Sequence, residues 1–203
     1  MVKINAVFFD LGGVLLRTED HTPRQQLAAH LGMTYGQLAE LIFNSETARL
    51  ATLGKISAEA HWEQVRQTLV LAPDEFLAAR QAFWDGDRLD LHLIQTIRTL
   101  RASRKTAMLS NAWDDLRSYI ENKWKFADAF DEMIISAEVG LAKPDPRIYQ
   151  YAADRLGFQT QECVLLDDFI ENVEGSRSVG MQAIHFQDRS SALDELEGLL
   201  NSH

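Results

Sequence analysis

Short apolar runs alternate along the chain with longer stretches in which apolar residues recur every three or four positions. The short runs, each closed by a polar residue or a glycine, predict buried strands, and the longer stretches predict amphipathic helices. This alternation predicts an α/β fold with a Rossmann-like parallel sheet flanked by helices. The expected strands are residues 4–9, 105–109, 133–135, 163–167 and 182–186.

Residues 17–89 interrupt this alternation. Their apolar positions recur with helical periodicity, and we expect no strand among them. We interpret the segment as a cap domain, a small α-helical bundle that lies over the edge of the sheet. The core domain then consists of residues 1–16 and 90–203.

Start signals place several helices. Thr22 and Thr34 are each followed three positions later by a glutamine, which is the spacing of a capping box. Ser57 is placed to cap the next helix of the cap, and Pro73 to occupy the first turn of another. Ser191 is expected to begin the last helix of the chain.

The aromatic residues of the cap are explained best as the core of the bundle, because they recur at helical spacing. These residues are Phe43, Trp62, Phe76, Phe83 and Trp84. Trp113 lies outside the cap, shortly after a predicted strand, and suits either a substrate pocket or packing against the cap.

Composition and charge narrow the range of partners. The chain has 203 residues, is 46% hydrophobic and carries a formal net charge of −10 at pH 7. This charge argues against a nucleic-acid partner, so any phosphate site must be built from local cations. No apolar run approaches the roughly 18 residues that span a bilayer, so we expect no membrane partner and a cytoplasmic location.

Asp10 ends the first predicted strand and is followed by Leu11 and two glycines. Glycines allow the tight reversal that leaves a carboxylate exposed at the edge of a sheet. Ligands of open α/β sheets bind at the carboxyl ends of the strands. Asp10 is therefore placed to act as a nucleophile.

Three further polar groups lie at comparable positions. Ser110 and Asn111 follow a predicted strand and offer a hydroxyl, an amide and backbone N–H groups to an oxyanion. Lys143 precedes a proline that restricts its backbone. Asp167 and Asp168 would repel each other unless a cation lay between them. A nucleophile, oxyanion donors, a fixed cation and metal-binding acids are what phosphoryl transfer requires.

With these groups in this order, the sequence resembles the haloacid dehalogenase (HAD) superfamily, whose members are mostly phosphatases. The motifs that carry the resemblance are Phe9–Leu15, Leu109–Asn111, Lys143–Pro144 and Leu166–Asp168 with Asn172. The resemblance covers nearly the whole chain. It implies a HAD core of parallel strands flanked by helices, with a helical cap inserted after the first motif.

The resemblance implies that Asp10 attacks phosphorus and forms an aspartyl-phosphate, while Lys143 neutralises the nucleophile and the transferring group. Ser110 would help to hold the phosphoryl oxygens. The expected substrate is a small phosphorylated metabolite. The residues expected to bind it are Ser110, Asn111, Lys143, Leu11 and Gly12.

The resemblance also implies a Mg²⁺ site. The ion would lie between Asp10, the backbone carbonyl of Gly12 and Asp168, and Asp167 would act through water. Oxygen ligands of this kind suit a small hard cation.

Gly12 departs from the family pattern, because most phosphatases of this superfamily have a second aspartate there that protonates the leaving group and activates water. A positioned acid or base contributes ~10²–10⁴ in rate. We therefore expect activity that depends on a substitute acid or on a leaving group that needs little protonation, such as an anomeric sugar phosphate or an acyl phosphate. The nearest substitutes in sequence are Glu19, Asp20 and His21.

Two alternatives to a phosphatase stay open. One is a non-catalytic binding protein with the HAD fold. The other is a metal-independent 2-haloacid dehalogenase, which also lacks the second aspartate. The acid pair Asp167–Asp168 argues against the dehalogenase, because that reaction needs no metal.

Overall fold

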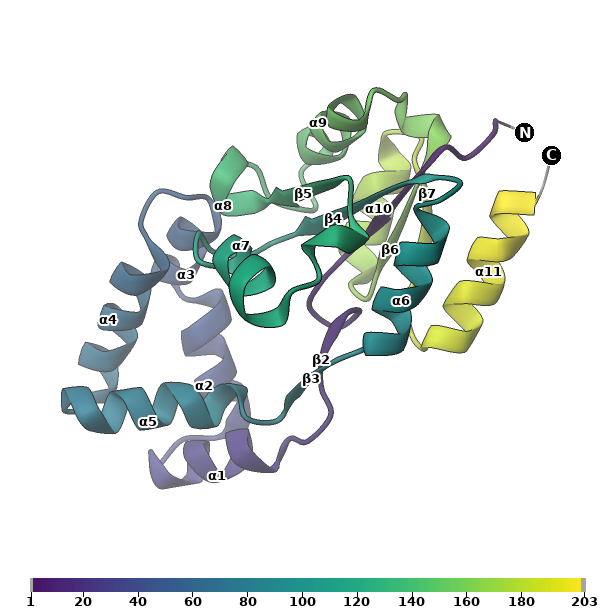
Figure 1. Cartoon of the computed structure of the whole chain (residues 1–203). Helices are drawn as coiled ribbons and strands as arrows, with labels where there is room; N and C mark the ends of the chain where they lie inside the picture. Colours follow the sequence, from purple (N-terminus) through teal and green to yellow (C-terminus); the bar gives the residue numbers. More distant parts are fainter. Residues whose placement is uncertain (1, 202–203) are drawn as a thin grey trace.

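The computed structural model describes residues 2–201 as an α/β core that carries a helical cap at one end (Figure 1). A five-stranded parallel sheet forms the centre of the core, in the order β5-β4-β1-β6-β7. Its strands are β1 (Ala6–Phe9), β4 (Lys105–Ser110), β5 (Glu132–Ile135), β6 (Cys163–Asp167) and β7 (Gln182–His185). The predicted α/β fold is therefore confirmed.

Helices cover both faces of this sheet. One face packs on α6 (Leu91–Leu100) and α11 (Arg189–Asn201), and the other on α9 (Pro146–Leu156) and α10 (Ile170–Ser178). In the central strand β1, Val7 and Phe9 pack in the apolar layer beneath α6 and α11, and Ala6 and Phe8 pack in the layer beneath α9 and α10. A strand buried on both faces must be apolar throughout, which explains its unbroken hydrophobic run.

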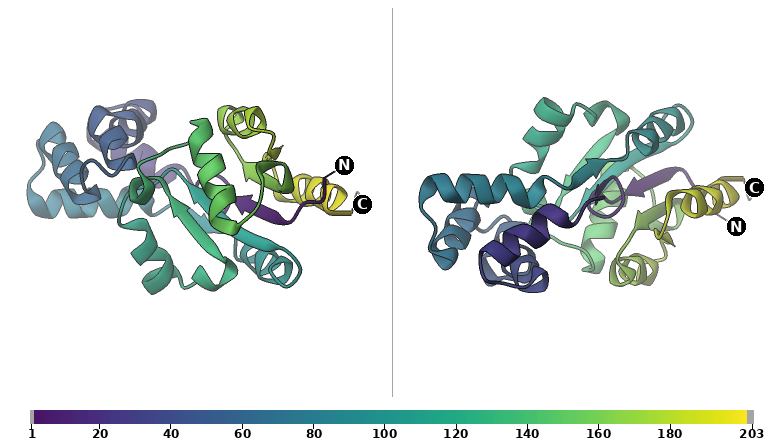
Figure 2. Two further views of the ribbon diagram at one scale, coloured as in Figure 1. Left: turned by 90° about the horizontal axis from the view of Figure 1, so that it is seen from above. Right: turned by 90° about the horizontal axis from the view of Figure 1, so that it is seen from below.

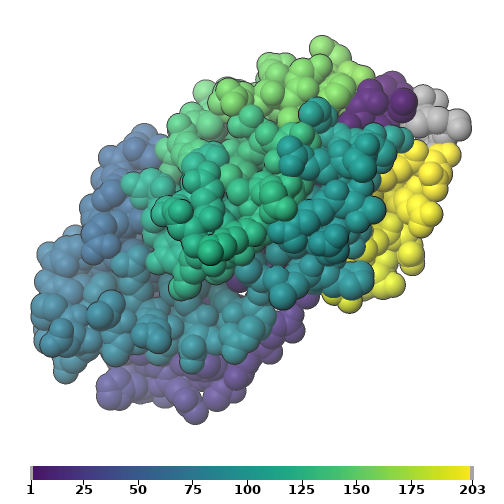
Figure 3. Space-filling model, viewed as in Figure 1, coloured from purple at the N-terminus to yellow at the C-terminus, as the bar shows by residue number. Residues whose placement is uncertain are grey.

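The cap is a bundle of short helices that projects beyond the carboxyl edge of the sheet and forms one end of the molecule (Figures 2 and 3). Its helices are α1 (Thr22–His30), α2 (Tyr35–Ala39), α3 (Glu46–Thr52), α4 (Ala58–Leu69) and α5 (Pro73–Trp84). They enclose an apolar cluster of their own, separate from the two layers on the sheet. The cap therefore has its own core.

Shorter elements complete the structure. These are α7 (Leu116–Ser118), α8 (Ser136–Val139), the π-helical turns Glu40–Asn44 and Tyr119–Trp124, and the 3-10 turns Ala127–Ala129 and Thr160–Glu162. Within residues 2–201, no helix combines the length and the apolar character that crossing a membrane requires.

The expectation that residues 17–89 contain no strand is wrong. Strands β2 (Leu16–Thr18) and β3 (Asp87–Leu89) pair antiparallel at the two ends of this segment. Each strand has three half-exposed or exposed residues, which is too short to give a periodic signal. Both connections between core and cap therefore run side by side through one two-stranded ribbon.

Three of the predicted helix starts are confirmed. Thr34 forms the expected capping box with Gln37. The Ser57 side chain accepts a hydrogen bond from the backbone N–H of Ala60 at the start of α4. Pro73 is the first residue of α5.

Two predicted caps are wrong, although α1 does begin at Thr22. The residue before α1 is His21, whose side chain makes no capping bond, and the backbone N–H of Thr22 donates instead to the Asp20 carboxylate. The last helix begins at Arg189, two residues before Ser191. At the last helix the Asp188 carboxylate accepts the backbone N–H of Ser191 at 3.0 Å, so Asp188, directly before the helix, takes the capping role expected of Ser191.

Candidate active site

Asp10 follows the last residue of β1, at the carboxyl edge of the sheet. The backbone N–H of Leu11 donates to its Oδ1 at 2.7 Å, and its own backbone N–H donates to the Leu166 carbonyl at 2.9 Å. The side chain of Asp10 is 9% exposed to solvent. The carboxylate is therefore held in one orientation and remains open to a ligand.

A tight turn follows Asp10. The carbonyl of Leu11 accepts the backbone N–H groups of Val14, Leu15 and Leu16, and Gly13 has a φ of 76°. A β-carbon at Gly13 would overlap the carboxylate of Asp168. Glycine at position 13 is thus required both by the backbone and by the close approach of an acidic residue from another motif.

Lys143 reaches the same place from the loop between α8 and α9. Its Nζ lies 2.9 Å from Oδ1 of Asp10 and donates to Oδ2 of Asp167, and its side chain is fully buried. Burial alone would lower the pKa of this ammonium, but the two carboxylates outweigh it and raise the pKa above its ordinary value. Lys143 is therefore a fixed positive charge.

The two acids of the fourth motif have different surroundings. Oδ1 of Asp167 accepts hydrogen bonds from the Phe169 backbone N–H and the Asn172 amide, both at 2.9 Å, and Oδ2 accepts from Lys143. In contrast, Oδ1 of Asp168 is buried and has no hydrogen-bond partner within residues 2–201. A buried oxygen without a partner calls for an explanation such as a bound ion.

Carboxylate oxygens of Asp10, Asp167 and Asp168 lie within 4.8 Å of one another. Burial is the main cause that raises the pKa of Asp10, to about 7. The charges of Asp167 and Asp168 raise it further, and the charge of Lys143 opposes them. Burial and the charge of Asp167 raise the pKa of Asp168 to about 6. A divalent cation would offset this repulsion and complete the coordination of the free Asp168 oxygen. An all-oxygen donor set fits Mg²⁺.

Ser110 ends β4, the strand beside β1. The register pairs Phe9 with Met108, so Ser110 lies near the level of Asp10 on the adjacent strand. Ser110 is buried, and its hydroxyl makes no hydrogen bond within residues 2–201. The hydroxyl is therefore free to bind a ligand.

Asn111 makes a contact that the sequence did not predict. Its Nδ2 donates to the backbone carbonyl of Lys143 at 2.8 Å, and its Oδ1 accepts the backbone N–H of Lys143 at 2.8 Å. The amide that we expected to hold phosphate is thus engaged with protein backbone, and a role for Asn111 in substrate binding stays a prediction. The two residues are 32 positions apart, so no local pattern could reveal the pair.

The cap contacts the core close to this strand end. Trp113 packs on His61 and Trp62 of the cap, with ring centroids 4.7 and 5.4 Å apart, so packing is the alternative that the structure favours for this residue. The backbone N–H of Ala58 donates to Asp114 at 2.8 Å. The cap is thus attached to the segment that follows Ser110 and Asn111.

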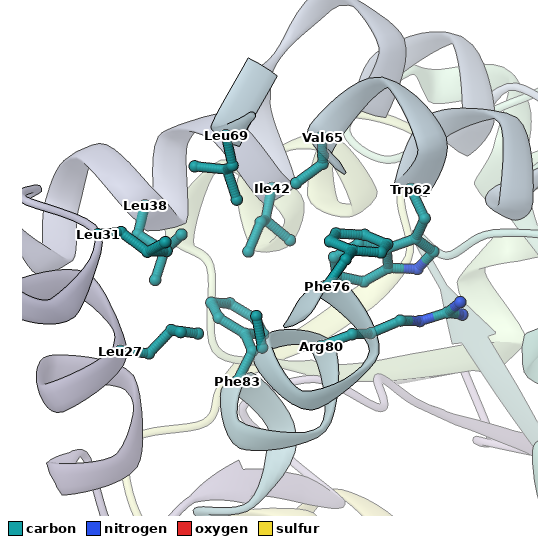
Figure 4. Close-up of a pocket in the computed structure, with 11 residues that line it drawn as sticks. Leu27, Leu31, Leu38, Ile42, Trp62, Val65, Leu69, Phe76, Arg80 and Phe83 are labelled. Carbon is teal, nitrogen blue, oxygen red and sulfur yellow. The ribbon is translucent and has the colours of Figure 1, made fainter. Parts of the chain in front are cut away.

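The interior of the cap holds a small apolar cavity of about 10 Å³ (Figure 4). This volume is close to the minimum that a single water molecule needs. Leu38, Ile42, Val65, Phe76 and Phe83 are among the residues that line it. Trp62, Phe76 and Phe83 are buried there, as expected for the core of the bundle, and Trp84 is partly buried and packs against them. The assignment of Phe43 to this core is wrong, because its side chain lies at the edge of the bundle and is 40% exposed.

Comparison with known proteins identifies the family. A profile of the haloacid dehalogenase-like hydrolases matches residues 4–180. The chain belongs to this family. Among HAD relatives, the sesquiterpene phosphatase astK of Aspergillus oryzae is 27% identical over 197 residues, which are 96% of each chain. The phosphatase MT3486 of Mycobacterium tuberculosis is 33% identical over 149 residues, 73% of this chain and 61% of that protein.

Other proteins are similar over part of their length or by fold. The bifunctional epoxide hydrolase 2 of Rattus norvegicus is 38% identical over 96 residues, 45% of this chain and 17% of that protein. A HAD family enzyme of Bacteroides thetaiotaomicron, in complex with magnesium and inorganic phosphate, superposes with a TM-score of 0.74 at 20% identity, over 93% of this chain and 98% of that one. A dehalogenase superposes with a TM-score of 0.70 at 22% identity over all of both chains. The two structures share the fold.

Proposed function

We propose that this HAD hydrolase is a Mg²⁺-dependent phosphatase that cleaves small phosphomonoesters through an aspartyl-phosphate on Asp10. The observation that carries the proposal is the placement of the Asp10 carboxylate, 2.9 Å from Nζ of Lys143 and within 4.8 Å of carboxylate oxygens of Asp167 and Asp168. Oδ1 of Asp168 is buried and has no hydrogen-bond partner among residues 2–201. Phosphoryl transfer depends on such positioning of a nucleophile between compensating charges. Two relatives named as phosphatases support the reaction class.

In the first step a carboxylate oxygen of Asp10 attacks phosphorus. The bond from phosphorus to the leaving oxygen breaks, and that oxygen keeps the electron pair. Lys143 stays beside the attacking carboxylate, and the free hydroxyl of Ser110 donates to a phosphoryl oxygen. Mg²⁺, held by Asp10, Asp168 and the backbone carbonyl of Gly12, would offset the negative charge of the phosphoryl group.

In the second step water attacks the phosphorus of the aspartyl-phosphate, inorganic phosphate leaves, and the Asp10 carboxylate is restored. Gly12 has no side chain to protonate the leaving group or to accept the proton of this water. Leaving groups that need little protonation, such as those of anomeric sugar phosphates and acyl phosphates, fit this site best. Slow hydrolysis of the intermediate would give a burst of leaving group followed by slow turnover.

The decisive experiment measures inorganic phosphate released from sugar phosphates, acyl phosphates and an activated aryl phosphate, with Mg²⁺ and with EDTA. We expect metal-dependent turnover that Asp10→Asn abolishes, and a preference for good leaving groups. A steady rate from the first turnover, with no burst, would count against slow hydrolysis of the intermediate.

The same assay separates the alternatives. Halide release from a 2-haloacid that persists in EDTA would indicate a dehalogenase. Binding of Mg²⁺ and phosphate by a folded protein that turns over no member of the panel would favour the non-catalytic HAD-fold protein.

A further inference from the structure

The side-chain amide of Asn111 makes two hydrogen bonds to the backbone of Lys143, in the manner of a strand pairing with its neighbour. Both polar atoms of the amide are used, since Nδ2 donates to the carbonyl and Oδ1 accepts the N–H of the same residue, each at 2.8 Å. An amide paired at two points is fixed in orientation as well as in distance. The carboxyl end of β4 is thereby tied to the loop that carries the buried ammonium.

The loop also lies close to α10. A β-carbon on Gly175 would lie 2.7 Å from the Pro144 carbonyl, so the helix passes as close to the loop as glycine allows. Between these two contacts, Nζ of Lys143 lies 2.9 Å from Asp10. Of these two contacts, the one with Asn111 is made by hydrogen bonds to the backbone of Lys143 itself.

We propose that the side-chain amide of Asn111 is a positioning group that fixes Lys143 against Asp10, and that it is not a ligand of the phosphoryl oxygens. This inference rests on the proposed phosphatase activity of the same site. An amide with both polar atoms engaged at good distances has little capacity left for substrate oxygens. Removing it frees the backbone of Lys143 while Ser110, Asp10 and Asp168 keep their places.

The kinetic test compares Asn111→Ala with the wild type on an activated aryl phosphate. Misplacement of a catalytic group by about 1 Å costs on the order of 10²-fold in rate. We expect kcat to fall by about that factor, while KM and the inhibition constant of inorganic phosphate stay within about twofold of the wild type. If the amide binds phosphate directly, the inhibition constant rises in the variant, and the inference is overturned.

A second readout follows Lys143 itself and does not depend on turnover. The protein is treated with an amine-acetylating reagent, and modification of Lys143 is measured by peptide mass spectrometry relative to the exposed Lys125. The buried amine of the wild type is protected, and we expect Asn111→Ala to increase its labelling at least several-fold. Equal protection in the folded variant would overturn the inference.

Asn5→Ala is the matched control, because it removes an amide hydrogen bond, to Glu162 at 2.7 Å, near the opposite end of the sheet. It should change neither kcat nor the labelling of Lys143. If Asn111→Ala does not fold, Asn111→Asp replaces it, since it keeps an acceptor for the Lys143 N–H and loses the donor to the carbonyl. If the phosphatase proposal fails, the wild type shows no metal-dependent phosphate release. The labelling experiment does not need turnover, so it still shows whether Asn111 fixes the position of Lys143.

Discussion

A β-carbon at Gly13 would overlap Oδ2 of Asp168, whereas a β-carbon at Gly12 would have no neighbour within 4 Å. Gly13 also has a positive φ of 76°, and Gly12 does not. Two adjacent glycines therefore have different roles. Gly13 allows Asp168 of the fourth motif to lie against the first motif, and Gly12 leaves an open space two residues after Asp10.

We expect Gly13→Ala to displace Asp168 and to weaken Mg²⁺ binding by at least tenfold, because the carboxylate cannot keep its place beside a methyl group. The backbone strain of alanine at this φ should also lower stability by about 1–2 kcal/mol. Gly12→Ala is the matched control and should bind Mg²⁺ like the wild type. Calorimetric titration with Mg²⁺ and thermal unfolding measure both effects. Equal Mg²⁺ affinity in the two variants would contradict this account.

Gly12→Asp should increase turnover, because the space at position 12 accepts a side chain and a positioned carboxyl can then transfer the proton. We expect the gain to approach ~10²–10⁴ for substrates with poor leaving groups and to be small for activated aryl phosphates. Gly12→Asn has nearly the same shape and cannot transfer the proton, so it should show no gain. The measurement is kcat/KM across a series of leaving groups of graded pKa. An equal gain with Asn would show that the effect is not acid–base chemistry.

Mg²⁺ binding should weaken as the pH falls. The metal binds ionised carboxylates, and in the free protein the pKa of Asp10 is raised to about 7 and that of Asp168 to about 6. Protons therefore compete with the ion below about pH 7, and binding at pH 6 should release protons, whereas binding at pH 9 should not. Titration calorimetry in buffers of different ionisation enthalpy measures this release. Asp168→Asn, the control, should lose most of the affinity at every pH.

Asp90 should stabilise the junction of core and cap in a pH-dependent way. Its carboxylate accepts the backbone N–H of Leu93 at 2.9 Å and pairs with Arg17 at 3.0 Å and Arg189 at 2.9 Å. Burial alone would raise the pKa of Asp90, but these partners together lower it below its ordinary value. We expect Asp90→Asn to cost about 1–3 kcal/mol at pH 7.

The sign of the pH dependence follows from the lowered pKa. The contribution of Asp90 is fully present above the unfolded value of about 3.9, and it is lost as the pH falls through the lower folded value. Urea unfolding of wild type and Asp90→Asn at pH 7 and at pH 3 measures the difference. The gap in unfolding free energy should narrow at pH 3, and a gap that widens there would contradict the prediction.

The sequence predicted the sheet well because its strands are buried on both faces. Asp10 directly follows the apolar strand β1, and Asp167 is the last residue of the apolar strand β6. The carboxyl edge of the sheet could therefore be located from those apolar runs alone. Asp168 could be singled out as the expected metal ligand only through the family resemblance, whereas the lack of a hydrogen-bond partner for its Oδ1 among residues 2–201 is visible only in the three-dimensional structure.

The contacts that could not be predicted are of two kinds. Some join residues distant in sequence, and others join strands too short to show a periodic pattern of apolar residues. The pairing of Asn111 with the Lys143 backbone depends on the distance between two loops. The ribbon of β2 and β3 depends on the register of two three-residue strands, Leu16 opposite Leu89. Neither the spacing of apolar residues nor the identity of a motif carries this information.

The ribbon has a consequence for how such proteins diversify. The chain leaves the core and returns to it through adjacent, hydrogen-bonded strands, and no residue between them pairs with the central sheet. Asp10, Ser110, Lys143 and Asp168 all lie outside the intervening segment. The cap is thus an insertion whose two ends meet at one ribbon, so its length and sequence can change without altering the residues proposed to carry out the reaction.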